Sequence, residues 1–235
     1  KGTIFMVNPT YEDVMLSKDG GATWIKANGG QYRNVRSACV MPHNDYLYIG
    51  TPRGVYHSTD DGATWTHDPV GMTNRDVRMI AVSPTQAIFA SCYGKNLYRS
   101  VDYGQSWSLV SETFNGGEIS LMRFTEDGVI FAGTETRGLF RSRDNGLTWS
   151  SIQSGLNRTL VTAICYNKDH GLYHGSYGEV HYSSDRGDSW TRITNDLPVA
   201  SVNAIEIGRS GQPAAADGLR RPWSIVTSSS CRRPR

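Results

Sequence analysis

The chain has 235 residues, of which 38% are hydrophobic and 20% are charged, and it contains 25 glycines. This composition excludes an intrinsically disordered protein and favours one large all-β domain with many turns, while no apolar run approaches the ~18 residues of a membrane-spanning helix. The formal net charge is +2, but residues 209–235 hold six arginines against one aspartate and carry +5, which leaves −3 for residues 1–208.

Short predicted strands follow one another along the chain. The first unit reads as strands at 3–7, 13–16 and 23–25. The third unit is complete, and its four strands, named a to d in chain order, are predicted at 77–82, 87–90, 96–99 and 106–109. Further a strands are predicted to begin at Val35, Ile119, Val161 and Val202. The first unit therefore lacks an a strand, whereas the last a strand has no unit after it.

Five octets of one pattern lie between the predicted c and d strands. Each begins with Ser and has Asp third, Gly fifth, Thr or Ser seventh and Trp last. They occupy Ser17–Trp24, Ser58–Trp65, Ser100–Trp107, Ser142–Trp149 and Ser183–Trp190, so their first serines are 41, 42, 42 and 41 residues apart. A fixed period near 42 residues is typical of the four-stranded blade of a β-propeller. The predicted fold is therefore an all-β propeller of four-stranded antiparallel blades.

Each fixed residue of the octet has a structural reason to be there. Asp and Ser side chains accept hydrogen bonds from backbone amides that a turn leaves unpaired, and Gly permits a positive φ. The tryptophan ring is expected to be buried between blades. We therefore predict structural roles, rather than catalytic or metal-binding ones, for Asp19, Trp24, Asp60, Trp65, Asp102, Trp107, Asp144, Trp149, Asp185 and Trp190.

These octets resemble the Asp-box, or BNR, repeat of sialidases, oligoxyloglucan hydrolases, sortilin-type receptors and photosystem II assembly factors. The resemblance covers nearly the whole chain and implies a propeller, but it spans enzymes, receptors and assembly factors, so fold alone does not decide function. It slightly favours a secreted or cell-surface location. The chain is also considered as one module of a larger protein.

Five blades are favoured, with the ring closed by the strand at 201–207 joining the N-terminal blade, because closure removes an exposed sheet edge. Six blades are the alternative, in which 211–226 forms a degenerate b and c pair. The domain prediction is a propeller over 1–208, followed at 209–235 by an arginine-rich tail or a partial blade. No specific nucleic-acid binding is predicted from that basic end, which we interpret as solvated.

The resemblance places ligands on the face opposite the octets, which the d-to-a and b-to-c loops form. Two loops there carry the related segments Arg33-Asn-Val-Arg36 and Arg75-Asp-Val-Arg78. Guanidinium groups and exposed rings suit an anionic ligand. The predicted ligand-binding residues are Arg33, Arg36, Arg53, Arg75, Arg78, Tyr93, Arg137 and Tyr177. The competing interpretation is that these arginines only form ion pairs with Asp76, Glu118, Glu135 and Glu179.

Two functions follow from these observations. The favoured one is a non-catalytic binding or assembly propeller that recognises an anionic group of a glycan or protein partner, with no cofactor and no metal. The alternative is a glycoside hydrolase of sialidase-like or xyloglucanase-like type, which needs two carboxyl groups roughly 5 to 9.5 Å apart. No pair of carboxylates is selected by the sequence, and the Arg-Ile-Pro segment expected of a sialidase is not present, so catalytic residues stay unassigned.

Overall fold

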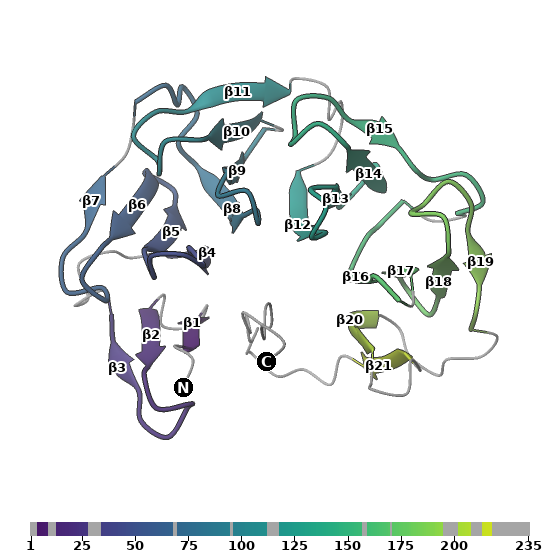
Figure 1. Ribbon diagram of the computed structural model, residues 1–235, viewed down its shortest axis with the longest axis horizontal. Coiled ribbons are helices and arrows are strands. Elements are labelled where there is room, and N and C mark those ends of the chain that lie inside the picture. The colour runs from purple at the N-terminus through teal and green to yellow at the C-terminus, as the bar shows by residue number, and fades with distance from the viewer. Residues whose placement is uncertain are drawn as a thin grey trace.

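A computed structural model describes residues 4–8, 13–27, 34–67, 70–94, 96–111, 118–156, 159–169, 171–194, 202–207 and 213–217. Within this described part of the chain, all regular secondary structure is β-strand. The sheets follow one another around a common axis, each running from an inner strand to an outer strand (Figure 1). The predicted propeller-like, all-β architecture is confirmed.

The first sheet, blade 1, has three strands: β1 (Ile4–Asn8), β2 (Asp13–Ser17) and β3 (Ile25–Lys26). Blade 2 is β4 (Ser37–Val40), β5 (Leu47–Thr51), β6 (Gly54–Ser58) and β7 (Thr66–His67). Blade 3 is β8 (Val77–Val82), β9 (Ile88–Cys92), β10 (Asn96–Ser100) and β11 (Ser108–Ser111).

Blades 4 and 5 repeat this order. Blade 4 is β12 (Ile119–Phe124), β13 (Ile130–Thr134), β14 (Leu139–Ser142) and β15 (Ser150–Ser151). Blade 5 is β16 (Ala163–Asn167), β17 (Gly171–Gly175), β18 (Val180–Ser183) and β19 (Thr191–Arg192). Consecutive strands pair antiparallel throughout, so every octet lies between the last two strands of its blade, the c and d strands that the sequence predicts.

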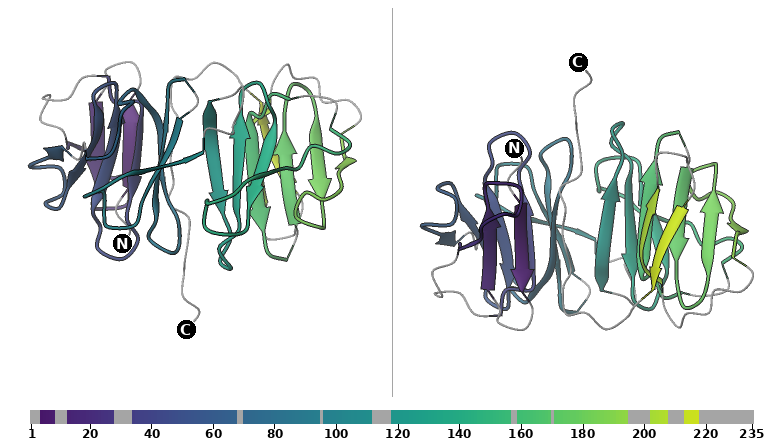
Figure 2. Two further views of the ribbon diagram at one scale, coloured as in Figure 1. Left: turned by 90° about the horizontal axis from the view of Figure 1, so that it is seen from above. Right: turned by 90° about the horizontal axis from the view of Figure 1, so that it is seen from below.

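The hydrophobic core is divided among the interfaces between neighbouring blades. Phe5 and Leu16 of blade 1 pack with Ile49 of blade 2, and Phe89 of blade 3 packs with Ile130 of blade 4. Strands lie side by side along the axis, and loops gather at the two ends (Figure 2). Burial of apolar side chains between sheets is therefore what fixes the position of each blade relative to the next.

The octet tryptophans join these interfaces, with one exception. Trp107 is only 4% exposed and packs with residues of the preceding blade, whereas Trp24 is 38% exposed. The indole of Trp65 donates to the carbonyl of Ala27 in blade 1, a bond across the interface, whereas Trp24 donates to Gly21 within its own turn. The predicted burial of Trp24 is wrong because the described residues place no blade before blade 1 for it to pack against.

Each octet is tied together by the same hydrogen bonds. In the second octet, the Ser58 hydroxyl accepts from the Gly62 amide at 2.8 Å and donates to Asp60 at 2.8 Å. Asp60 also accepts from the amide and hydroxyl of Thr64, at 2.8 and 2.6 Å. The hydrogen bond from the Thr64 hydroxyl is the main cause that lowers the pKa of Asp60 to about 2. The octet aspartates therefore act as acceptors that hold the turn.

Replacing an octet serine is expected to destabilise its blade. Ser100 is buried, accepts from the Gly104 amide at 2.8 Å and donates to Asp102 at 2.7 Å. Ser100→Ala leaves a buried N–H without a partner, which costs about 1–3 kcal/mol of unfolding free energy. The control is Ser108→Ala on exposed β11, expected to stay within about 0.5 kcal/mol of wild type. Urea unfolding measures both, and equal midpoints for the two variants contradict the role given to Ser100.

The expected ring closure is not seen. Strand β20 (Val202–Ile207) pairs with β21 (Pro213–Asp217) and packs against blade 5, while β1 pairs only with β2 among the described residues. Closing a short hairpin costs less chain entropy than joining the two ends of the chain. Among the described residues, β20 and β21 thus form a two-stranded sheet of their own, and β21 lies within the segment 209–235, predicted as an arginine-rich tail or a partial blade.

Candidate anion-binding site

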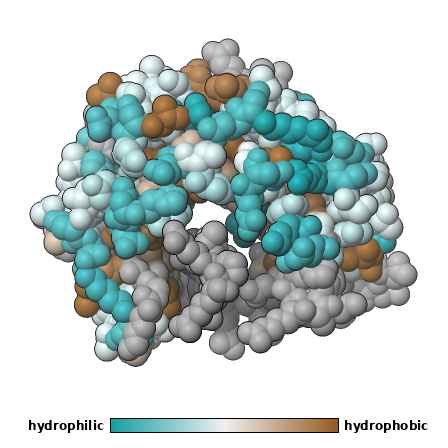
Figure 3. All heavy atoms as spheres, viewed as in Figure 1, coloured by the Kyte–Doolittle hydropathy of each residue, from teal (hydrophilic) through white to brown (hydrophobic). Residues whose placement is uncertain are grey.

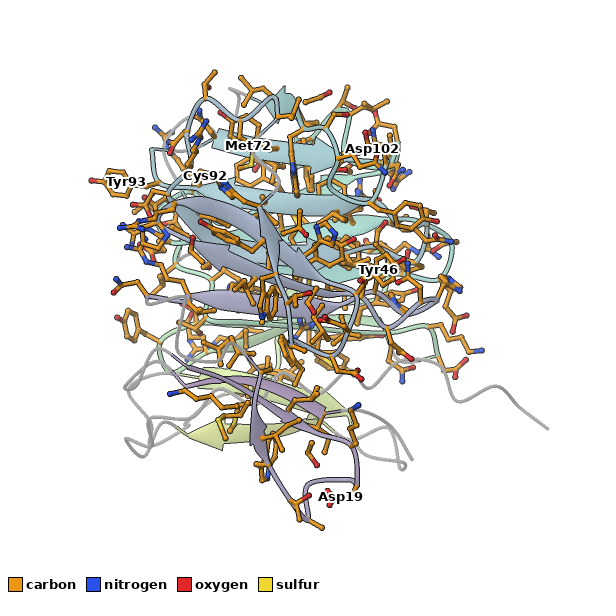
Figure 4. The ribbon with its side chains drawn as sticks, turned by 90° about the vertical axis from the view of Figure 1, so that its left-hand side faces the viewer. Asp19, Tyr46, Met72, Cys92, Tyr93 and Asp102 are labelled. Atoms are coloured by element: carbon orange, nitrogen blue, oxygen red, sulfur yellow. The ribbon has the colours of Figure 1, made fainter. Side chains whose placement is uncertain are left out.

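The face opposite the octets carries a cluster that we call the arginine slot: Arg36, Asp76, Arg78 and Tyr93. Tyr93, in the loop between β9 and β10, and Asp102, in the third octet, lie at opposite ends of the strands (Figure 4). Seen along the axis, polar residues cover much of the visible surface around a hollow near the centre (Figure 3). The slot lies where the inner strands of blades 2 and 3 begin.

Two arginines from neighbouring blades meet on one carboxylate. The guanidinium of Arg36, just before β4, forms an ion pair with one oxygen of Asp76. The guanidinium of Arg78, on β8, lies 3.4 Å from the other oxygen. The amide of Ile80 donates to the Ser37 hydroxyl at 2.9 Å, so the two inner strands are bonded to each other directly below these arginines. The last arginine of each Arg-x-Val-Arg segment, Arg36 or Arg78, therefore lies at the same carboxylate.

Tyr93 provides an aromatic wall for the slot. The Arg78 guanidinium carbon lies 5.0 Å from the centre of the Tyr93 ring, a cation–π distance, and the ring is 57% exposed. The Tyr93 amide donates to the carbonyl of Asp76 at 2.8 Å. Asn74 closes the arrangement, because its side chain accepts from the Asp76 amide at 3.1 Å and donates to the Tyr93 carbonyl. Asp76 and Tyr93 are therefore fixed relative to each other through their backbones.

The slot has a surplus of positive charge. Two guanidinium groups face one carboxylate, and all three side chains are about one third exposed. The Nε atom of Arg78 is buried and makes no hydrogen bond to any described residue, so a ligand from solvent does not reach it. Each guanidinium group has five N–H donors, and those on the partly exposed ends of Arg36 and Arg78 remain for a further anion.

The other predicted binding residues do not join the slot. Arg53, Arg75, Arg137 and Tyr177 are exposed, and within the described ranges their side chains make no hydrogen bond or ion pair. Arg33 lies outside the described residues. Among the described residues, Asp76 pairs with the slot arginines as the competing interpretation predicts, while Glu179 pairs with Arg192 and Glu118 accepts from the Gly94 amide at 3.4 Å. The positioning residue Asn74 was missed, because its role depends on a loop contact that no sequence spacing encodes.

No group of three or more His, Cys, Asp or Glu side chains suited to a metal ion occurs in the described part of the chain. Among the same residues, no helix has the length and apolar character needed to cross a membrane.

Comparison with known proteins supports the fold. The family model of Sortilin-Vps10, described as sortilin, neurotensin receptor 3, matches residues 95–204, just under half of the chain. No curated protein sequence matches the chain. The resemblance of this chain to Asp-box propellers is supported by the sortilin-type family match and by the solved structures described next.

Three solved structures illustrate the range of that fold. A structure titled "YCF48 bound to D1 peptide" aligns with a TM-score of 0.66 at 18% identity, over 86% of this chain and 68% of that one. The GH74 xyloglucanase from Xanthomonas campestris aligns with a TM-score of 0.66 at 19% identity, over 83% of this chain but 38% of that one. Virginiamycin B lyase from Staphylococcus aureus aligns with a TM-score of 0.72 at 12% identity, over 94% and 83%. The same architecture thus serves binding proteins and enzymes.

Proposed function

We propose that this chain is a non-catalytic binding or assembly propeller that recognises an anionic group of a glycan or protein partner at the arginine slot. The observation that carries the proposal is the convergence of Arg36 and Arg78, from two blades, on a single carboxylate beside an exposed tyrosine ring. A site of this kind needs no cofactor and no metal, and it can operate in a free chain or in a module of a larger protein.

Physical chemistry favours binding over a purely structural ion pair. Exposed ion pairs contribute little to stability, roughly 0–1 kcal/mol, so stability alone gives little reason to hold two arginines on one aspartate. Planar guanidinium groups bind carboxylates in a defined geometry, and an adjacent ring adds apolar contact. One protein that shares this fold is described as bound to a peptide, which supports a peptide as one candidate ligand.

The test is a binding array of acidic peptides and oligosaccharides at low and high salt. Arg36→Gln/Arg78→Gln is expected to weaken binding of the recognised ligand at least ~10-fold, because each lost charge-assisted hydrogen bond contributes more than a neutral one. Wild-type binding is also expected to weaken as salt rises, since the slot is partly exposed.

The matched control removes two charges from the opposite face. Arg143, in the fourth octet, lies 3.6 Å from Asp188, and Arg186, in the fifth octet, lies 2.6 Å from Asp127, so Arg143→Gln/Arg186→Gln is expected to bind like wild type. Equal binding by the slot variant and this control variant, or binding that salt leaves unchanged, would refute the proposal.

A glycoside hydrolase is the second candidate, because the Xanthomonas campestris xyloglucanase shares this fold. Hydrolysis requires two carboxyl groups placed for acid and nucleophile or base. Release of reducing sugar from xyloglucan, or of sialic acid from sialosides, by the purified chain would replace the binding proposal with this one. Absence of turnover on both substrate classes would remove it.

A further inference from the structure

We propose that the arginine slot binds a carboxylate of a peptide segment, and that Asp76 competes with this ligand carboxylate for Arg36 and Arg78. Asp76 thereby sets the affinity of the site for the peptide. This inference rests on the proposed function and adds the chemical class of the ligand and the residue that regulates access to it.

The geometry shows what the slot accepts. Asp76 places one oxygen on Arg36 and the other near Arg78, so the separation of the two guanidinium groups matches the bite of a single carboxylate. The carboxylate does not hang from a freely rotating loop, because the Asp76 amide donates to Asn74 and its carbonyl accepts from Tyr93. An aspartyl side chain on an extended backbone segment is thus the occupant that this slot holds, which favours a peptide over a glycan.

The repeats match in sequence but differ in backbone at the position of Asp76. Arg33-Asn34-Val35-Arg36 and Arg75-Asp76-Val77-Arg78 align, so that Asn34 stands where Asp76 stands one blade later. Asn34 has a φ of 63, whereas Asp76 does not have a positive φ, so Asn34 is not a structural stand-in for Asp76→Asn. Blade 4 has Ser120 and blade 5 has Thr162 where blades 2 and 3 have arginine, so the slot is specific to one pair of blades.

Removal of the competitor is expected to strengthen binding. In wild type, an incoming carboxylate meets the negative charge of Asp76 and must share or displace its arginines. Asp76→Asn removes this repulsion and releases two charged donors, for which Coulomb's law at a few ångströms near a protein surface gives an affinity gain of about 10-fold or more. Tyr93 keeps its backbone bond to residue 76 in this variant, since that bond uses the carbonyl.

The experiment titrates a rhodamine-labelled hexapeptide, Ser-Gly-Tyr-Asp-Gly-Ser capped at both ends, against the full chain by fluorescence anisotropy. Asp76→Asn is expected to bind this peptide about 10-fold or more tightly than wild type, and to bind the Asn counterpart of the peptide no better. Asp61→Asn is the matched control, because Asp61 pairs with Lys18 on the octet face and loses the same charge. Far-UV circular dichroism confirms that both variants are folded.

Each result decides the inference. Equal or weaker binding by Asp76→Asn overturns it, and the proposed function then stands or falls separately on the Arg36 and Arg78 variants. Stronger binding of oligogalacturonate alone by Asp76→Asn also overturns it, because the slot then serves a glycan. A gain shared by Asp61→Asn overturns it as well, since the effect is then one of net charge.

Discussion

Acidification from pH 7 to about 4 is expected to destabilise blade 5 before the other blades. His174 on β17 and His181 on β18 are opposite in register, 1% and 3% exposed, with ring centroids 5.8 Å apart. Burial, followed by the charge of His181, lowers the pKa of His174 to about 4. Burial also lowers the pKa of His181, which Glu179 raises and Arg192 lowers further. Both rings are therefore neutral in the folded protein at pH 7.

The sign of the effect follows from these directions. Unfolding exposes both rings to water, where their pKa is about 6.5, so the unfolded chain binds more protons as the pH falls below that value. The stability that the neutral rings contribute is present above about pH 6.5 and is lost as the pH falls toward the folded value. For His174 the loss is about 3 kcal/mol by pH 4, from the size of its pKa difference.

The other blades show what replaces this pair. The equivalent cross-strand pairs are Ile49 with Tyr56, Ala90 with Tyr98 and Ala132 with Phe140, none of which titrates in this range. His174→Ala/His181→Phe therefore gives blade 5 the same cross-strand pair as Ala132 and Phe140 of blade 4. The ring of Trp190, 6.0 Å from the His174 ring, is part of the surroundings of this pair. The copied pair has no imidazole to protonate.

Hydrogen–deuterium exchange of β17 and β18 between pH 7 and 4, corrected for intrinsic exchange rates, measures the effect. Wild type is expected to lose protection there over this range, whereas the double variant is expected to keep it, because the pKa of Asp185, the octet aspartate of blade 5, is held well below its usual value, chiefly by the hydrogen bond from the Ser189 hydroxyl. Exposed His43→Gln serves as the control and is expected to behave like wild type. The explanation is wrong if the double variant loses protection at the same pH as wild type.

Local sequence signals predicted the repeating part of this structure well. The octets determined the blade period, because each one builds its own turn from residues at most seven positions apart, such as Ser142 with Gly146 and Asp144 with Thr148. The residues that build such a turn all lie within one repeat, so the sequence of that repeat is sufficient to predict it. The strand predicted at 201–207 also follows from the local sequence pattern, and β20 confirms it.

Partners across long distances were harder to predict. The pattern of β20 identifies a strand but does not say whether it pairs with β1 or β21, because either partner satisfies the same alternation of side chains. Prediction of the arginine slot was limited in the same way. The repeated arginines indicated a positive cluster, but the position of Asp76 between Arg36 and Arg78 depends on the distance between two blades, which the sequence does not give. Trp24 kept the octet pattern yet lacks the neighbour that buries the other rings.

Gly62→Ala is expected to cost roughly 3 kcal/mol or more of unfolding free energy, because two penalties combine. Gly62 has φ +84, where a Cβ atom is disfavoured, and that Cβ would lie 2.4 Å from the carbonyl oxygen of Ala27 in blade 1. The same oxygen accepts from the Trp65 indole at 3.0 Å, so moving it also disturbs the bond that ties blade 2 to blade 1. A glycine here serves the packing of two blades as well as the turn.

Gly20→Asn separates these two penalties. Gly20 also has a positive φ, +77, but a Cβ there meets no atom within 4 Å. The same octet position is Asn145 in blade 4, with φ 57, so asparagine tolerates this conformation in this turn. Gly20→Asn is expected to stay within about 1 kcal/mol of wild type in urea unfolding. A similarly small loss for Gly62→Ala would show that the contact with Ala27 relaxes, and that glycine is required there only for its φ.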